Sequence, residues 1–386
     1  MNEVIASDGF PFSLAEYQRR WALLRQAMER RDADAIVVFR GSSVEYLCGY
    51  HTVETLPQPL LVLASGERLL SVPDAEVGRA LASSCASEIL HHHALEDGLS
   101  IAAQHLVHRL GRSARVLVEL SDGRTPPRFA QLIGADGLEV LDGDYLVERL
   151  RLRLSDEELR YLEAAAEITH RGDAAAVAAL RSGVRTDSEL ATAIRTALTE
   201  GADSRAPFDV VVATGMWGGI PHSTWANRPI ERGTSTFLEY SGASGRYCAP
   251  VMRTVTVDEP PSSVTELAEL TQTALAAVLQ AARPGTPASD VARHAEQALG
   301  ILPDSVIFHF NFGYPLGIAH PPTWMDGAPF YIVRTNDAPL ETGMAFHAPM
   351  SFRYFGKAGV GLSQSFVVED SGARVLTHGP AELTRV

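Results

Sequence analysis

The chain has 386 residues, more than a single hydrophobic core usually holds, so its length predicts two domains. Hydrophobic residues make up 46% and charged residues 21%, which is typical of a globular protein and argues against a disordered one. The formal net charge of −14 argues against nucleic acid as a ligand, because binding phosphates needs a basic surface.

Three widely spaced cysteines, Cys48, Cys85 and Cys248, form no CxxC pair and suggest no disulfide framework, which favours a reducing compartment. The N-terminal residues lack the basic and apolar segments of a secretory signal. No apolar run approaches the roughly 20 residues of a membrane span. We therefore expect a cytoplasmic protein without a membrane partner.

The first part of the chain alternates helical and strand patterns. Helices are predicted near 13–31, 74–84 and 98–110 and from about 126, and strands near 35–39, 60–63, 69–72, 116–119 and 138–141. This alternation predicts a small α/β domain over residues 1–150. The run His91–His93 has no carboxylate or cysteine at ligand spacing, so a solvated strand end is favoured over a metal tract.

Longer helical patterns begin near residue 151. Ser155 and Glu158 have capping-box spacing and predict the start of a long helix linking the domains. Further helix starts are predicted at Thr186 and Pro287, and strands near 208–213, 235–241, 250–257, 344–352 and 361–368. Residues 151–386 are thus predicted to form an α+β domain, and no GxGxxG follows a strand to indicate a dinucleotide site.

The strongest functional signal lies between Pro221 and Val257, where a His precedes an apolar strand, a turn, a Tyr and an Arg-Thr pair. Together with Phe312–Gly317 and Leu340–Pro349, this layout resembles the methionine aminopeptidase, prolidase and creatinase superfamily, the pita-bread proteins. The resemblance covers nearly the whole chain. It implies a small N-terminal creatinase-like α/β domain followed by a C-terminal pita-bread domain.

The resemblance also places the family's five metal-ligand positions on residues of this chain, namely Glu239, Pro250, Tyr314, Pro349 and Ser363. Hydrolases hold divalent ions with carboxylates and imidazoles, and only Glu239 retains an anionic oxygen. The metal-free branch of the superfamily contains the creatinases and ectoine hydrolases, and the run around Tyr247–Thr254 is most similar to the latter. No metal and no other cofactor is expected.

Two residues are predicted to be catalytic. His222 lies in a Gly-rich, aromatic loop, and its imidazole can donate or accept a proton at neutral pH; the alternative is a loop His bonded to a backbone carbonyl. Glu239 follows an apolar strand segment, where a buried carboxylate could act as a nucleophile or base, grip a cationic amidine, or form a structural salt bridge with Arg253.

Other side chains on the same segments are candidate substrate-binding groups, since aromatic faces bind small cations and phenols donate to oxyanions. Each has the alternative of belonging to the core, and His347 points either toward the site or away from it. The candidates are Tyr50, Trp217, Tyr240, Tyr247, Tyr314, His320, Trp324, His347 and Gln364.

Two classes of function remain open. One is a cofactor-free hydrolase of a C–N bond in a small amidine-, lactam- or N-acyl-containing amino-acid derivative; the other is a catalytically inert pita-bread protein that binds a small molecule or partner. A metal-dependent Xaa-Pro aminopeptidase is opposed by the four lost ligands. Met252 and Pro349 stand where the resemblance expects guanidinium-gripping carboxylates, which argues against creatine, and Gln364 replaces an acid expected for ectoine.

The resemblance implies a homodimer, in which the small domain of one subunit closes the site of the other. The aromatic loop Tyr46–His51 is the segment expected at the neighbouring site.

Overall fold

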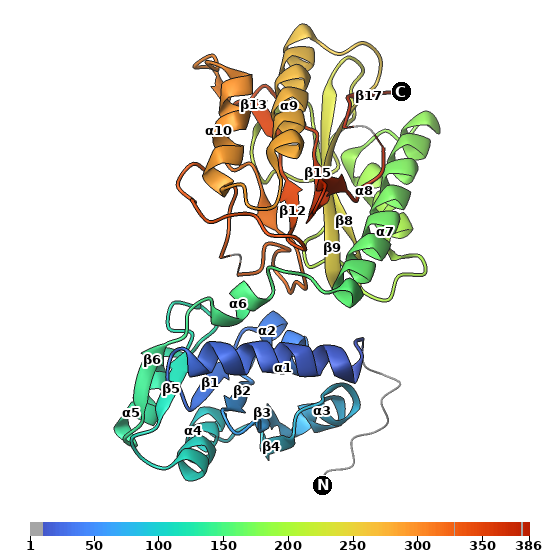
Figure 1. Ribbon diagram of the computed structural model, residues 1–386. Helices are drawn as coiled ribbons and strands as arrows, with labels where there is room; N and C mark the ends of the chain where they lie inside the picture. The colour runs from blue at the N-terminus through green and yellow to red at the C-terminus, as the bar shows by residue number, and fades with distance from the viewer. Residues whose placement is uncertain (1–10, 328, 380) are drawn as a thin grey trace. The chain divides into compact units, whose positions relative to one another are not determined.

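The computed structural model describes residues 11–327, 329–379 and 381–386, and it divides into two compact units between Arg151 and Leu152 (Figure 1). Each unit has its own hydrophobic core. The predicted fold class, an α/β unit followed by an α+β unit, is confirmed. Within the described ranges, no helix combines the length and apolarity that crossing a bilayer requires.

The first unit is built on a six-stranded sheet with strand order β4-β3-β2-β1-β5-β6. Its strands are β1 (Ala35–Val38), β2 (Leu60–Leu63), β3 (Arg68–Pro73), β4 (Glu88–His92), β5 (Arg115–Val118) and β6 (Glu139–Asp142). Its helices are α1 (Leu14–Glu29), α2 (Gly41–Cys48), η2 (Asp74–Glu76), α3 (Val77–Ser83), α4 (Gly98–Leu110), α5 (Pro127–Ala135) and α6 (Leu146–Leu150). Strands β1, β5 and β6 run parallel, so their carboxyl ends meet at one edge.

One prediction in this unit is wrong. Tyr46 was expected in a loop, but it lies in helix α2, which ends at Cys48 and is capped by Gly49 with a φ of 81°. Seven of the eight residues of α2 are buried, so this helix has no exposed polar face and no amphipathic pattern to reveal it. Tyr50 is also buried, and its hydroxyl donates to Gln58 at 2.5 Å and lies 2.9 Å from Glu76.

The second unit contains three small sheets, with orders β17-β9-β8-β7, β11-β12-β15-β16 and β10-β13-β14. The strands are β7 (Val211–Thr214), β8 (Ser235–Ser244), β9 (Tyr247–Thr256), β10 (Val306–Ile307), β11 (Tyr314–Pro315), β12 (Ala345–Ala348), β13 (Ser351–Tyr354), β14 (Ala358–Gly361), β15 (Gln364–Glu369), β16 (Gly372–Val375) and β17 (Thr384–Arg385). The helices are α7 (Asp156–Arg181), α8 (Asp187–Thr199), η3 (Gly215–Gly219), α9 (Ser262–Ala281) and α10 (Ala288–Leu299).

The capping boxes predicted at Ser155 and Thr186 are both present, and they begin α7 and α8. Helix α7 packs along β8 and β9, and α9 packs on β13 and β14 (Figure 1). A Cβ at Gly242 of β8 would lie 2.6 Å from the Ala165 carbonyl oxygen, so only glycine permits this close approach of α7. Helix α9 was not among the predicted elements.

Candidate functional site

Strands β8 and β9 present two faces with different chemistry. Successive side chains of a strand alternate, and paired residues of neighbouring strands share a face. Glu239 pairs with Met252 and Leu238 pairs with Arg253. We call the side carrying Phe237, Glu239 and Met252 the Glu239 face, and the side carrying Leu238, Tyr240 and Arg253 the Arg253 face.

Glu239 lies in the middle of β8, within the predicted strand 235–241, and the strand continues to Ser244. Its carboxyl is partly buried, and burial raises its pKa to about 7, while the charge of Arg353 acts in the opposite sense. The predicted alternative of a salt bridge to Arg253 is wrong, because Arg253 pairs with Asp173 at 3.3 Å on the other face. Glu239 is therefore a carboxyl that exchanges a proton near neutral pH.

Arg353 is the residue that the sequence reasoning missed. It lies on β13 opposite Gly359, and its guanidinium carbon is 5.2 Å from the centre of the Phe237 ring. In the described part of the chain, its Nε is buried without a hydrogen-bond partner and its guanidinium forms no salt bridge. Burial lowers the pKa of Arg353 and the charge of Glu239 opposes this. Arg353 is half-buried, so its guanidinium is partly desolvated without an ion pair to offset the cost, which makes it a candidate binding group for an anion.

A continuous hydrogen-bonded row of side chains occupies three of the segments that carry the ligand positions. Trp324 Nε1 donates to the Tyr314 hydroxyl at 2.7 Å, and that hydroxyl lies 2.5 Å from His347 Nδ1. His347 Nε2 lies 2.6 Å from Ser363 Oγ. Burial, and then the charge of Arg253, lowers the pKa of His347 to about 3, so this imidazole is neutral.

This row lies near Glu239, since the charge of the carboxylate contributes to raising the pKa of Tyr314 well above its ordinary value, after the larger effect of burial. The predicted candidates Tyr314, Trp324 and His347 are thus brought together with Glu239. Ser363, noted only as a lost ligand, closes the row and also accepts a hydrogen bond from the Met252 amide at 2.5 Å.

The ligand positions of the family do not fit a metal centre in this chain. Pro250 and Pro349 have no side-chain donor, and the oxygens of Tyr314 and Ser363 are engaged with His347. Among the described residues, no group of three His, Cys, Asp or Glu side chains is arranged to hold a metal ion. A dinuclear site needs several bridging carboxylates, which this donor set does not provide.

Two tyrosines predicted for the site lie on the Arg253 face instead. The Tyr240 hydroxyl donates to Asp173 at 2.5 Å, and the Tyr247 hydroxyl donates to Glu158 at 2.7 Å. Both acceptors belong to α7, so these phenols fasten the helix to the sheet. A hollow of about 310 Å³ also borders this face, but the Asp173 and Arg253 that line it are already paired.

His222 lies in the turn after η3, is exposed, and has a φ of 61°. No hydrogen bond of its imidazole is formed with the other described residues, so the predicted alternative of a carbonyl-bonded loop His is not what the structure has. Trp217, in η3, is partly exposed and stacks under the guanidinium of Arg228 at 4.0 Å. Neither side chain is shown in contact with Glu239.

The three remaining candidates are buried within their own units. Gln364 is buried, donates to the Gly379 carbonyl at 2.8 Å and accepts from Thr377. His320 is buried in the loop after β11. Tyr50 belongs to the first unit, where its hydroxyl is already bonded.

The fold defines a pita-bread protein, and two of the positions that the resemblance assigns to metal ligands, Tyr314 and Ser363, are joined by hydrogen bonds through His347. The chain matches the model of metallopeptidase family M24 over residues 160–370 and that of the creatinase/prolidase N-terminal domain over residues 20–153. The chain belongs to family M24, which confirms the predicted superfamily and supports a hydrolase.

One relative is similar in sequence over nearly its whole length, and two solved structures share the fold. An uncharacterized hydrolase/peptidase of Sinorhizobium fredii is 30% identical, covering 96% of this chain and 98% of its own. The dipeptidase PepE of Mycobacterium ulcerans is 25% identical with a TM-score of 0.81, covering 97% of this chain and 99% of its own. A prolidase of Thermococcus sibiricus is 23% identical with a TM-score of 0.83, covering 97% and 100%.

Proposed function

We propose that this protein is a metal-independent hydrolase of a C–N bond in a small amino-acid derivative of the amidine, lactam or N-acyl class. The observation that carries the proposal is the Glu239 face, where a carboxyl with a pKa of about 7 lies near Arg353, which has no ion-pair partner among the described residues. Beside it, Tyr314 and Ser363 stand at two expected ligand positions and are bonded to His347. Family M24 membership supplies the expectation of hydrolysis, and the donor set argues against metal chemistry.

Glu239 is proposed as the reacting carboxylate. With a pKa of about 7 it is present in both protonation states at neutral pH, as acid–base catalysis requires. In one route it removes a proton from the attacking water and returns it to the nitrogen as the C–N bond breaks. In the other its carboxylate attacks the substrate carbon to form an acyl-enzyme, and His222 protonates the departing nitrogen. In the second route a base is needed for deacylation, and we assign this to His222, whose imidazole is exposed and unbonded among the described residues.

Arg353 is proposed to bind the substrate carboxylate. A guanidinium takes a carboxylate in two parallel hydrogen bonds, and an amino-acid derivative carries such a group at a fixed distance from its C–N bond. Because Arg353 and Glu239 influence each other electrostatically without forming an ion pair, we propose that a substrate places its carboxylate on the arginine and its reacting carbon at the glutamate.

Three residues restrict the range of possible substrates. Met252 lies on the Glu239 face and Pro349 follows β12, and neither can hold a cationic guanidino group, which argues against creatine. Gln364 stands where the resemblance expects an acid for ectoine, and its amide is already bonded to the Gly379 carbonyl and to Thr377. It therefore cannot take the place of that acid. We therefore propose an ectoine-like or related substrate rather than ectoine itself.

A homodimer is proposed from the family resemblance. Tyr50 is buried in its own unit, so it would reach a neighbouring site only if its bonds to Gln58 and Glu76 were released. Sedimentation velocity at micromolar concentration tests the dimer, and a purely monomeric species contradicts it.

The proposed activity is tested by turnover of a panel of cyclic amidines, lactams and N-acyl amino acids, with and without EDTA, together with elemental analysis of the purified protein. We expect turnover that survives the chelator. Chelator-sensitive turnover with stoichiometric transition metal indicates a metallopeptidase instead. A folded protein that turns over nothing, but binds panel members, indicates an inert binding protein.

The roles of the two catalytic residues are separated by mass spectrometry. If Glu239 is the nucleophile, His222→Ala incubated with substrate accumulates an adduct on Glu239, because deacylation stalls without its base. His222→Ala should also lower kcat by at least about two orders of magnitude. Glu269→Gln, an exposed change on α9, is the matched control and keeps wild-type turnover.

A further inference from the structure

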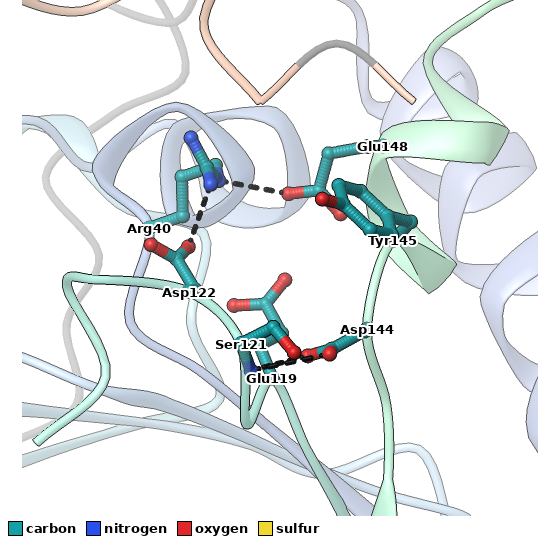
Figure 2. A pocket seen from close by; sticks show the side chains of 7 residues that line it. All are labelled: Arg40, Glu119, Ser121, Asp122, Asp144, Tyr145 and Glu148. Atoms are coloured by element: carbon teal, nitrogen blue, oxygen red, sulfur yellow. Dashed lines mark hydrogen bonds and ion pairs between the residues drawn. The ribbon is translucent and has the colours of Figure 1, made fainter. Parts of the chain in front are cut away.

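A small pocket lies in the first unit, outside the proposed active site. Its cavity volume is about 30 Å³, and Figure 2 shows the seven residues that line it, Arg40, Glu119, Ser121, Asp122, Asp144, Tyr145 and Glu148. We call it the acid pocket. It lies beyond the carboxyl ends of the parallel strands β1, β5 and β6, the edge where open α/β sheets bind ligands.

Glu119 is the unusual member of this pocket. It is only 2% exposed, and neither of its carboxylate oxygens has a hydrogen-bond partner among the described residues. Figure 2 places its carboxylate between Asp122 and Tyr145, directed into the pocket. A buried carboxylate without hydrogen bonds is strongly destabilising, so we expect a bound group to supply the missing donors.

The charges around Glu119 indicate what kind of ligand the pocket would bind. Arg40 is the single cation lining the pocket, and it is already used by Asp122 at 2.9 Å and by Glu148 at 3.0 Å. Asp144 accepts the Ser121 amide. Four carboxylates therefore share one guanidinium, and Glu148 Oε2 also has no hydrogen-bond partner in the described ranges. The acid pocket lacks positive charge and hydrogen-bond donors.

The arrangement does not suit a divalent metal. Ca²⁺ takes about six to eight oxygen ligands and Mg²⁺ about six at short, fixed distances. No three His, Cys, Asp or Glu groups of the described residues are placed to hold a metal ion, and this includes the acid pocket. Free carboxylate oxygens that do not converge on one point are better matched by a cation that donates separate hydrogen bonds.

We propose that the acid pocket binds a small ammonium-type cation, either NH₄⁺ or the ammonium head of a short primary amine, through Glu119 and the free oxygen of Glu148. An ammonium nitrogen supplies several N–H donors and one positive charge, which are the two things the pocket lacks. The pocket is large enough for an ammonium ion, because a group the size of a water molecule needs a cavity volume of about 10–15 Å³ and the pocket offers about 30 Å³.

Binding is coupled to a proton. Burial, and then the charges of Glu148 and Asp122, raise the pKa of Glu119 well above its ordinary value. Arg40 offsets this only in part, as does the Phe39 amide, which approaches the carboxylate without reaching hydrogen-bond geometry. The cation favours the ionised carboxylate, so its binding releases a proton from Glu119 and tightens as pH rises. Asp144 and Tyr145 are the other titratable groups that face the pocket.

The test is the melting temperature of the full chain in ammonium, methylammonium, ethylammonium, potassium, sodium and tetramethylammonium chloride at matched ionic strength. We expect a saturable rise in Tm with ammonium, extended to the primary amines if an amine head is the natural ligand, and no such rise with the other salts. An equal response to potassium or tetramethylammonium overturns the proposal, because neither ion donates a hydrogen bond.

Glu119→Gln keeps the shape of the side chain and removes its charge, so it should fold and lose the response, with an apparent Kd at least roughly ten-fold weaker. Glu139→Gln, an exposed change on the neighbouring strand β6, is the control and keeps the response. If Glu119→Gln does not fold, calorimetry of the wild type in two buffers of different ionisation enthalpy measures the released proton. Ammonium binding that survives in Glu119→Gln, or that releases no proton, overturns the assignment.

Discussion

The two faces of β8 and β9 use the same kinds of side chain in opposite ways. On the Arg253 face, Arg253 is paired with Asp173, and the phenols of Tyr240 and Tyr247 end on carboxylates of α7. On the Glu239 face, Glu239 and Arg353 affect each other's pKa without forming a salt bridge in the described part of the chain. The charged groups of the Arg253 face are paired within the fold, whereas Glu239 and Arg353 on the other side have no ion-pair partner among the described residues and are proposed to bind a ligand.

Glu239→Gln is the most direct test of the catalytic role that we propose for the Glu239 face. Removing the reacting carboxylate should lower kcat by at least about 10²-fold, the lower range of acid–base catalysis. The folded pKa of about 7 lies above the carboxyl's ordinary value of 4.5, so wild-type stability should fall as pH rises between these values. Urea unfolding across this pH range should show that slope in the wild type and not in the variant. Wild-type turnover in Glu239→Gln would refute the assignment.

Arg353→Met removes the unpaired cation while keeping an extended side chain. We expect kcat/KM for a carboxylate-bearing substrate to fall about 10- to 100-fold, mainly through KM, since a charge-assisted hydrogen-bond pair is lost. The pH dependence should also move to higher pH, because Arg353 lowers the pKa of Glu239. Arg334→Met, an exposed arginine paired with Glu296, serves as control. An unchanged KM would remove Arg353 from the site.

His347→Phe tests the hydrogen-bonded row behind the Glu239 face. The change leaves the Tyr314 and Ser363 hydroxyls without their shared partner, so the free energy of unfolding should fall by about 1–3 kcal/mol. Denaturant unfolding measures this, and His294→Phe on the exposed side of α10 should change it little. A stability equal to wild type would mean that the row repacks.

Asp173→Asn tests the opposite face and has the smallest expected effect. It removes the charge partner of Arg253 but keeps an oxygen for the Tyr240 hydroxyl, so about 1 kcal/mol of stability should be lost. Turnover should remain at the wild-type level, since this face holds the helix rather than the substrate. A large loss of activity with unchanged stability would reverse the roles assigned to the two faces.

Much of the fold could be predicted because its signals are local. The capping boxes at Ser155 and Thr186 lie within four residues of sequence and fix two helix starts. Helix α2 could not be found in this way, because it is buried nearly all round. Helix α9 does bury residues at helical spacing, so its omission reflects a signal that was present.

The candidate site was predicted only where the resemblance supplied the positions. Glu239, Tyr314 and His347 were named and are brought near one another, but Tyr240 was placed with Glu239 although strand alternation already separates neighbouring residues. Arg353 could not be found, because it reaches Glu239 through the pairing of β13 with β14 and the packing of that pair on Phe237. Such proximity depends on tertiary structure.

The row from Trp324 to Ser363 also has a direction. Its heavy-atom distances allow the Tyr314 hydroxyl to donate to His347 Nδ1 and Nε2–H to donate to Ser363. They also allow the reverse, in which Ser363 donates to Nε2 and Nδ1–H donates to Tyr314. The hydroxyl hydrogen of Tyr314 then points away from His347 and can be donated to another acceptor. The indole of Trp324 donates in both cases. The row can therefore adopt either hydrogen-bond polarity with every heavy atom in place, and switching between the two requires one proton to enter at one end hydroxyl and one to leave at the other.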